Sequence, residues 1–253
     1  MEIKKCILTK NDCYKAGERM TPAGIVVHST GANNPNLKRY VQPDDGFLGV
    51  NPNKNDWNRS GTGKCVHAFV GKDVDGEVKA YQTLPWTMRC WGCGSGKLGS
   101  YNSNRIQFEI CEDSLVDKKY FEAAFSAAAD LCAFLCEKYD ISPDAILSHA
   151  EAHKKGYASN HGDCDHWLRN FGKNMKWFRE EVKKRIKPKQ VDTSYRVRVT
   201  AYSLYVRNGA GTKYRINNVV KRGEVYTIVD EQNGWGKLKS GAGWVNLSYT
   251  TRL

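Results

Sequence analysis

The segment from Ser148 to Trp167 of this 253-residue chain reads SHAEAHKKGYASNHGDCDHW and brings imidazole, carboxylate and thiol side chains together in one stretch. It holds Asp163, Cys164 and Asp165, together with four of the six histidines, at positions 149, 153, 161 and 166. Imidazole, carboxylate and thiolate groups are common zinc ligands in proteins. The segment therefore predicts a metal site.

A second, distant segment is expected to complete that site, because one loop rarely supplies the three protein ligands of a catalytic zinc ion. The best candidate is His28. It ends the run GIVVH, residues 24–28, whose apolar side chains predict a buried strand. Such a strand would hold the histidine rigidly at a sheet edge.

Three motifs follow one another along the chain: IVVHST from Ile25, QFEI from Gln107, and LSH ending at His149, with a His-x-Asp sequence ending at Asp163. In this order they resemble the zinc-dependent N-acetylmuramoyl-L-alanine amidases of the amidase-2 and peptidoglycan-recognition type, which include many phage endolysins. The resemblance covers roughly the first two thirds of the chain. It implies that His28, His149 and Asp163 hold a zinc ion.

The third ligand and its neighbourhood depart from the usual family pattern. The family commonly has a lysine two residues before this ligand, whereas this chain has His161 there, so the resemblance implies that His161 takes the role of that lysine. Some relatives use cysteine as the third ligand, which leaves Cys164 as an alternative. Asp163 is favoured because it keeps the two-residue spacing from His161.

The resemblance implies that Glu109 is the catalytic base, although other relatives use a tyrosine in this role. Glu109 lies in the alternating run RIQFEI, residues 105–110, on the face opposite the apolar side chains of the predicted strand. By resemblance, zinc would polarise the amide between the muramic-acid lactyl group and L-alanine, and Glu109 would move a proton from water to the leaving nitrogen. Protonated His161 would stabilise the oxyanion that develops.

The periodicity of the chain predicts an α/β domain with a mixed central sheet flanked by helices. Strand patterns cover residues 24–28, 66–70, 78–84 and 105–110, and helical patterns cover residues 117–139 and about 167–186. Residues 183–194, KKRIKPKQVDTS, are charged and contain Pro188, so they are expected to form a helix end and then a linker.

The region from Tyr195 to Leu253 has short β-like runs separated by turns and no helical period, which predicts a small barrel. Its segments SLYVRNG, KRGEVY and NGWGKL resemble bacterial SH3-like domains, which implies binding to the cell wall. We therefore expect a catalytic amidase domain over residues 1–182, a linker over 183–194 and an SH3-like barrel over 195–253.

The net charge of +12 is concentrated near the C-terminus. Residues 183–253 contain 15 lysines and arginines against 4 acidic residues, whereas residues 1–182 contain 24 against 23. This asymmetry predicts a polyanionic partner, either a teichoic-acid-bearing wall or nucleic acid. Taken with the resemblance, the expected partners are peptidoglycan and the bacterial wall, and nucleic acid is not expected.

Nine cysteines and an N-terminus without a signal-peptide apolar region predict mostly reduced thiols. Cys90 and Cys93 are expected to be small buried residues in a turn. Cys132 and Cys136 are expected in the helical core. No apolar run approaches the length of a membrane span. The protein is therefore expected to be made in the cytoplasm and to act on the wall after release.

Two alternatives remain beside the favoured amidase of phage or prophage endolysin type. A cysteine wall endopeptidase would use Cys164 as its nucleophile, but the neighbouring Asp163 and Asp165 would disfavour the thiolate. A non-catalytic peptidoglycan-recognition protein would bind without cleavage. The presence of Glu109 beside a full ligand set argues against it.

Overall fold

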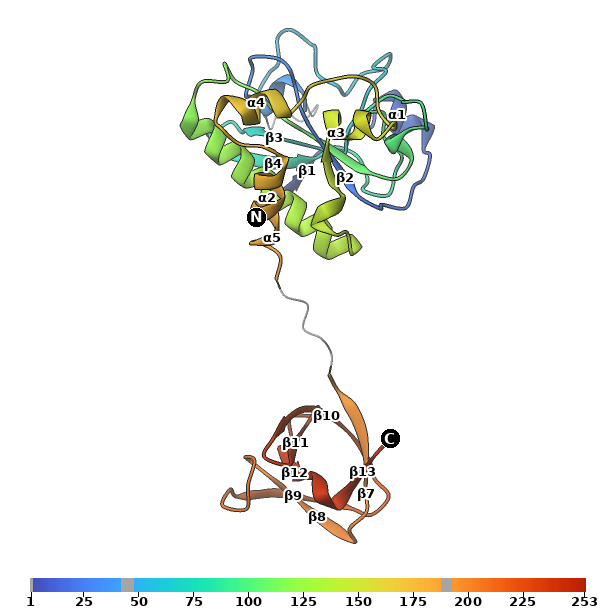
Figure 1. The fold of residues 1–253 in the computed structure, drawn as a ribbon, viewed down its shortest axis with the longest axis vertical. Helices are drawn as coiled ribbons and strands as arrows, with labels where there is room; N and C mark the ends of the chain where they lie inside the picture. The colour runs from blue at the N-terminus through green and yellow to red at the C-terminus, as the bar shows by residue number, and fades with distance from the viewer. Residues whose placement is uncertain (1, 42–47, 188–192) are drawn as a thin grey trace. The chain divides into compact units, whose positions relative to one another are not determined.

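The computed structural model describes residues 2–41, 48–187 and 193–253. It divides the chain into two compact units, Met1–Lys187 and Pro188–Leu253 (Figure 1). The last described helix of the first unit, α5, ends at Lys183. Residues 188–192 of the expected linker lie outside the described part of the chain.

The first unit is built on a mixed six-stranded sheet in the order β1-β4-β3-β5-β2-β6. Strand β2 is parallel to its neighbours β5 and β6, whereas β3 is parallel to β5 and antiparallel to β4. The expected mixed α/β sheet is confirmed. Its strands are β1 (Ile3–Lys5), β2 (Ile25–Ser29), β3 (Ala68–Lys72), β4 (Val78–Gln82), β5 (Ile106–Ile110) and β6 (Ile146–Ser148).

Strands β1 and β6 were not expected from the sequence. Each has three residues, which is too short for an alternating pattern to become visible. The strand β2, which lies between β5 and β6, is buried along its whole length, in agreement with its continuous apolar run. Its register with β5 places His28 opposite Glu109, at the carboxyl end of both strands.

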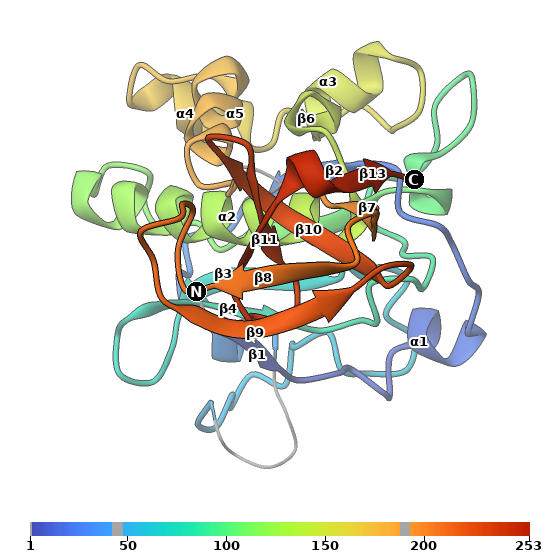
Figure 2. The same ribbon diagram turned by 90° about the horizontal axis from the view of Figure 1, so that it is seen from below.

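The helix α2 (Lys118–Tyr139) packs its apolar side against the sheet and forms the main core of the unit (Figures 1 and 2). Asp117 caps it by accepting a hydrogen bond from the Tyr120 amide. Cys132 and Cys136 are buried in this core, as expected. The remaining helices of the unit are α1 (Asp12–Ala16), α3 (His149–Lys154), α4 (Asp165–Asn170) and α5 (Met175–Lys183), and short 3₁₀ turns cover Leu37–Arg39, Tyr101–Ser103 and Pro143–Ala145.

The expectation of one helix over about 167–186 is wrong, because the chain breaks it into α4 and α5. Gly172 adopts a left-handed conformation with φ of 65°, which ends the first helix. Asn174 then caps α5 by accepting a hydrogen bond from the Trp177 amide. The apolar residues of both pieces still face one core, which is why they share one helical pattern.

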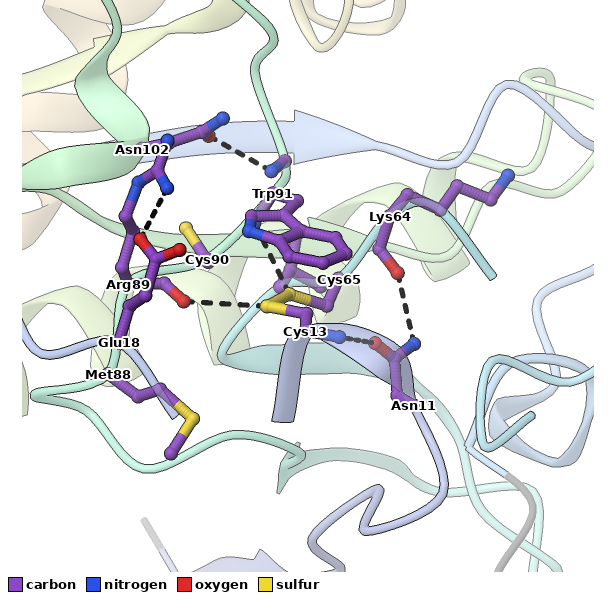
Figure 3. Close-up of a disulfide and its surroundings, with 12 residues drawn as sticks. Asn11, Cys13, Glu18, Lys64, Cys65, Met88, Arg89, Cys90, Trp91 and Asn102 are labelled. Carbon is purple, nitrogen blue, oxygen red and sulfur yellow. Dashed lines mark hydrogen bonds and ion pairs between the residues drawn. A yellow bond between two sulfur atoms is a disulfide. The ribbon is translucent and has the colours of Figure 1, made fainter. Parts of the chain in front are cut away.

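One cysteine pair differs from the expected thiols. Cys13 of α1 and Cys65 form a disulfide with a Cα–Cα distance of 6.3 Å across 52 positions of sequence. Figure 3 shows the bridge beside Trp91, whose backbone amide donates to the Cys65 sulfur at 3.2 Å. The other seven cysteines, all in described segments, form no disulfide. Among them Cys90 and Cys93 are buried, as expected.

The second unit is a seven-stranded sheet in the order β13-β7-β10-β11-β12-β8-β9, in which each pair of neighbouring strands is antiparallel. Its small core includes Val197, Val206 and Ile228. The expected β domain is confirmed, and its SH3-like character stays a prediction. The elements are β7 (Tyr195–Val199), β8 (Ser203–Arg207), β9 (Ile216–Lys221), β10 (Val225–Gln232), β11 (Trp235–Leu238), β12 (Trp244–Asn246), a 3₁₀ turn (Leu247–Tyr249) and β13 (Thr250–Arg252).

Among the described residues, no helix combines the length and the apolar character needed to cross a membrane.

Candidate metal centre

Three elements bring His28, His149 and Asp163 together. The rigid strand β2 carries His28, which is 1 % exposed. His149 is the first residue of α3, where Ser148 and Glu151 form a capping box that fixes the start of the helix. Asp163 lies in the loop before α4. The ligand atoms of the three residues all lie within 4.8 Å of one another.

The distances between these atoms fit a shared cation. His28 Nδ1 lies 3.0 Å from His149 Nδ1 and 3.1 Å from Asp163 Oδ2, and His149 Nδ1 lies 3.5 Å from Asp163 Oδ1. Ligands bound tetrahedrally to zinc at 2.0–2.1 Å are about 3.3 Å apart. Two nitrogens and one carboxylate also match the donor set of catalytic zinc sites, so these residues fit the expected ion.

The carboxyl group of Asp163 is held ionised. Its partial burial opposes ionisation, but hydrogen bonds with His149 and His28 outweigh this effect and hold its pKa well below the usual range. A carboxylate that stays charged is the form that binds a metal ion.

The outer nitrogen of each histidine has its own hydrogen-bond partner. His28 Nε2 lies 2.9 Å from Gln107 Oε1, and His149 Nε2 lies 3.3 Å from the Ser159 hydroxyl oxygen. Such outer contacts orient metal-binding histidines. Sequence reasoning did not identify Gln107 or Ser159 as part of the site, although Gln107 stands in the QFEI motif itself.

His161 lies beside the cluster without joining it. Its Nδ1 is 3.1 Å from the Ser159 hydroxyl oxygen, and its ring centroid is 4.8 Å from that of His149. The side chain is exposed, so it can reach a substrate that lies over the three ligand residues.

Glu109 stands next to His28 across the β2–β5 pair. Its Oε2 is buried and has no hydrogen-bond partner among the described residues. Burial first, and then repulsion from Asp163, raise its pKa well above the ordinary value. A carboxyl group with a raised pKa beside a set of candidate metal ligands is suited to general base catalysis.

Cys164 does not face the cluster. It is fully buried, its sulfur lies 4.0 Å from the Met175 sulfur, and burial raises its pKa well above that of an ordinary thiol. A buried neutral thiol is a poor nucleophile, which argues against the cysteine-peptidase alternative.

The remaining three histidines are not part of the cluster either. His67 is a buried core residue, bonded to the Met88 carbonyl and to the Gln107 amide. His153 Nδ1 bonds the Ala158 carbonyl. His166 Nε2 pairs with Glu112 at 2.9 Å.

Comparison with solved structures supports the fold. The Staphylococcus aureus hydrolase AmiA, solved in complex with its ligand, matches with a TM-score of 0.52 and 20% identity over 74% of this chain and 88% of that chain. PlyL matches with a TM-score of 0.50 and 23% identity over 72% of this chain and 97% of that chain. The PlyG catalytic domain matches with a TM-score of 0.50 and 24% identity over 76% of this chain and all of that chain, at 100%.

No curated protein sequence matches the chain. The model of the Amidase_2 family, described as N-acetylmuramoyl-L-alanine amidase, matches residues 18–165. This segment exceeds half of the chain and contains His28, Glu109, His149 and Asp163. The chain therefore belongs to the Amidase_2 family of N-acetylmuramoyl-L-alanine amidases.

Proposed function

We propose that this protein is a zinc-dependent peptidoglycan amidase of endolysin type, which cleaves the amide bond between N-acetylmuramic acid and L-alanine. The single observation that carries the zinc proposal is the convergence of His28, His149 and Asp163 within the family-matched segment. The endolysin type follows from the sequence motifs and from the basic second unit.

His28, His149 and Asp163 would hold the zinc ion. When bound there, zinc supplies Lewis acidity, which polarises an amide carbonyl and lowers the pKa of water. His28 and His149 hold fixed positions because the buried strand β2 and the capped start of α3 carry them. Fixed ligands spare the site a reorganisation cost during the reaction.

Glu109 would act as the general base and then as the general acid. Its raised pKa lets it accept a proton from water and return that proton to the leaving nitrogen of L-alanine. Its unpaired, buried Oε2 leaves an acceptor that no other described side chain occupies.

His161 would stabilise the oxyanion that forms on the amide oxygen. Its position next to His149 and its exposure support this role, because a hydrogen-bond donor there would be open to the substrate. Ser159 would orient its ring through the contact at Nδ1, which leaves Nε2 for the substrate.

The second unit would hold the enzyme on the wall. Its excess of lysine and arginine complements the anionic polymers of a bacterial wall. Exposed tyrosines, among them Tyr202 and Tyr205, add flat surfaces that suit sugar or peptide contacts. Peptidoglycan is thus the expected partner of both units.

The test uses purified cell walls and full-length protein, assayed before chelation, after chelation and after zinc is restored. We expect new N-terminal L-alanine without new reducing sugar ends, only when zinc is present. Glu109→Gln should retain zinc and lose about 10²–10⁴-fold in rate, whereas the exposed control Glu77→Gln should keep its rate.

Two results would contradict the proposal. Chelator-resistant cleavage of another peptide bond would show that a nucleophile other than zinc-activated water carries out the reaction. Wall binding without any cleavage in zinc would instead identify a recognition protein.

A further inference from the structure

We propose that Gln107 is a positioning residue, which holds the His28 imidazole so that Nδ1 is the nitrogen left for the metal. We also infer that position 92 is glycine because the Gln107 side chain occupies the space that a larger residue would need. Both statements rest on the proposed zinc function. Gln107 and Gly92 are neither proposed zinc ligands nor proposed catalytic residues.

Two backbone amides fix the orientation of the Asn102 side chain, because a backbone N–H group can only donate a hydrogen bond. The N–H groups of Gly92 and Cys93 both donate to Asn102 Oδ1 at 3.0 Å. That atom must be the oxygen of the Asn102 side chain, because an amide nitrogen cannot accept these bonds. Gln107 Nε2 lies 2.9 Å from the same oxygen, so this end of Gln107 is its NH₂ group.

The opposite end of the Gln107 amide is then its oxygen, which can only accept. It lies 2.9 Å from His28 Nε2, so this nitrogen carries a hydrogen. Nδ1 is left to face His149 and Asp163, whether it is bare or carries a proton that a metal would displace. The bond is shielded from water, since Gln107 is 0 % and His28 1 % exposed.

Gly92 leaves the space that the Gln107 side chain occupies. A Cβ atom there would lie 2.4 Å from Gln107 Oε1 and 3.1 Å from Val66 Cγ1, which is too close for either neighbour to stay in place. The backbone of Gly92 lies outside the left-handed region that favours glycine, so space rather than chain conformation requires it. A methyl group at position 92 should push the amide of Gln107 away from His28.

The expected size of the effect follows from other metal sites. Loss of an outer hydrogen-bond partner of a ligating histidine typically weakens metal binding about 10–100-fold. Gln107→Met removes the acceptor while nearly keeping the volume of the side chain. Gly92→Ala keeps the acceptor but displaces it, so the two variants should weaken binding by similar factors.

The experiment measures the zinc dissociation constant of full-length protein by competition with a chromophoric chelator. Gln107→Met and Gly92→Ala should each bind zinc about 10–100-fold more weakly than the unaltered protein. The matched controls are Gln82→Met, on β4, and Gly63→Ala, where an added Cβ meets no atom within 4 Å. Both controls should stay within about twofold of the unaltered protein.

A second readout separates positioning from a general loss of structure. In zinc-loaded protein labelled with ¹⁵N-histidine, the His28 Nε2–H should be a slowly exchanging proton, because it is buried and bonded to Gln107. In Gln107→Met this proton should exchange faster, while the backbone amide signals of β5 remain those of the folded protein. If Gln107→Met does not fold, Gly92→Ala provides the same test with the glutamine present.

The outcomes distinguish this inference from the proposed function. Zinc binding by the unaltered protein with unchanged affinity in Gln107→Met and Gly92→Ala would overturn the role of Gln107 and leave the zinc enzyme intact. Failure of the unaltered protein to bind zinc would overturn both.

Discussion

His67 should make the first unit lose stability in mild acid. The His67 side chain is fully buried. Its Nε2 lies 2.8 Å from the Met88 carbonyl oxygen, and its Nδ1 accepts a hydrogen bond from the backbone N–H of Gln107 at 3.0 Å. Burial lowers its pKa from 6.5 to about 4. The folded protein therefore holds the His67 ring in its neutral form.

The sign and size of the effect follow from proton linkage. As the pH falls below 6.5, the unfolded chain takes up a proton that the folded His67 does not accept until about pH 4. One pKa unit corresponds to 1.36 kcal/mol, so the free energy of unfolding should fall by about 3 kcal/mol across this window. Above pH 6.5 and below pH 4, His67 causes no further change of the free energy of unfolding with pH.

The assay is urea unfolding of chelated protein at pH 7.5 and pH 4.5, followed through amide NMR signals of β2 and β5 so that the first unit is observed alone. His67→Asn keeps an acceptor for the Gln107 amide but cannot reach the Met88 carbonyl, which should cost about 1–3 kcal/mol at pH 7.5. This variant should lose about 2–3 kcal/mol less on acidification than the unaltered protein. The exposed control His153→Asn should keep the full loss. Equal losses in His67→Asn and the unaltered protein would refute the reasoning.

Three further perturbations test the candidate site and the stability of the first unit. Cys164→Ala should keep wall hydrolysis and zinc binding, because this thiol is buried away from the cluster; abolished activity in a folded variant would restore the cysteine-peptidase alternative. Reduction of the Cys13–Cys65 bridge should lower the free energy of unfolding of the first unit by about 2–4 kcal/mol, and a Cys13→Ser variant should then show no further change with reductant. His161→Lys should extend the alkaline limb of the rate profile, since lysine keeps its proton to higher pH than histidine, and an unchanged limb would argue against the oxyanion role.

Much of the first unit could be predicted from local sequence patterns. The buried run before His28 and the alternation around Glu109 predicted β2 and β5, and the helical spacing after Asp117 predicted α2. The family resemblance read from three motifs is confirmed by the match over residues 18–165. These successes depend on periods of two and 3.6 residues and on motif order, which are properties of the chain before it folds.

Other features had no local signal. The break between α4 and α5 depends on the conformation of Gly172, which an uninterrupted apolar spacing conceals. Strands β1 and β6 are defined by their partners in the sheet rather than by their three residues each. The bridge between Cys13 and Cys65 requires knowledge of which thiols meet across 52 positions.

The candidate site divides in the same way. Residue types and motif spacing were enough to select His28, His149 and Asp163 as candidate zinc ligands, because a metal site needs a small set of donor groups that can be recognised in a sequence. The spacing from His161 favoured Asp163 over Cys164 in the sequence, but the burial of the Cys164 thiol in the core, which keeps it out of the cluster, came from the folded chain. So did the contact of Gln107 with His28 and the space it takes from Gly92. Hydrogen bonds and steric exclusion act between atoms a few ångströms apart, and only folding brings these residues together from distant parts of the sequence.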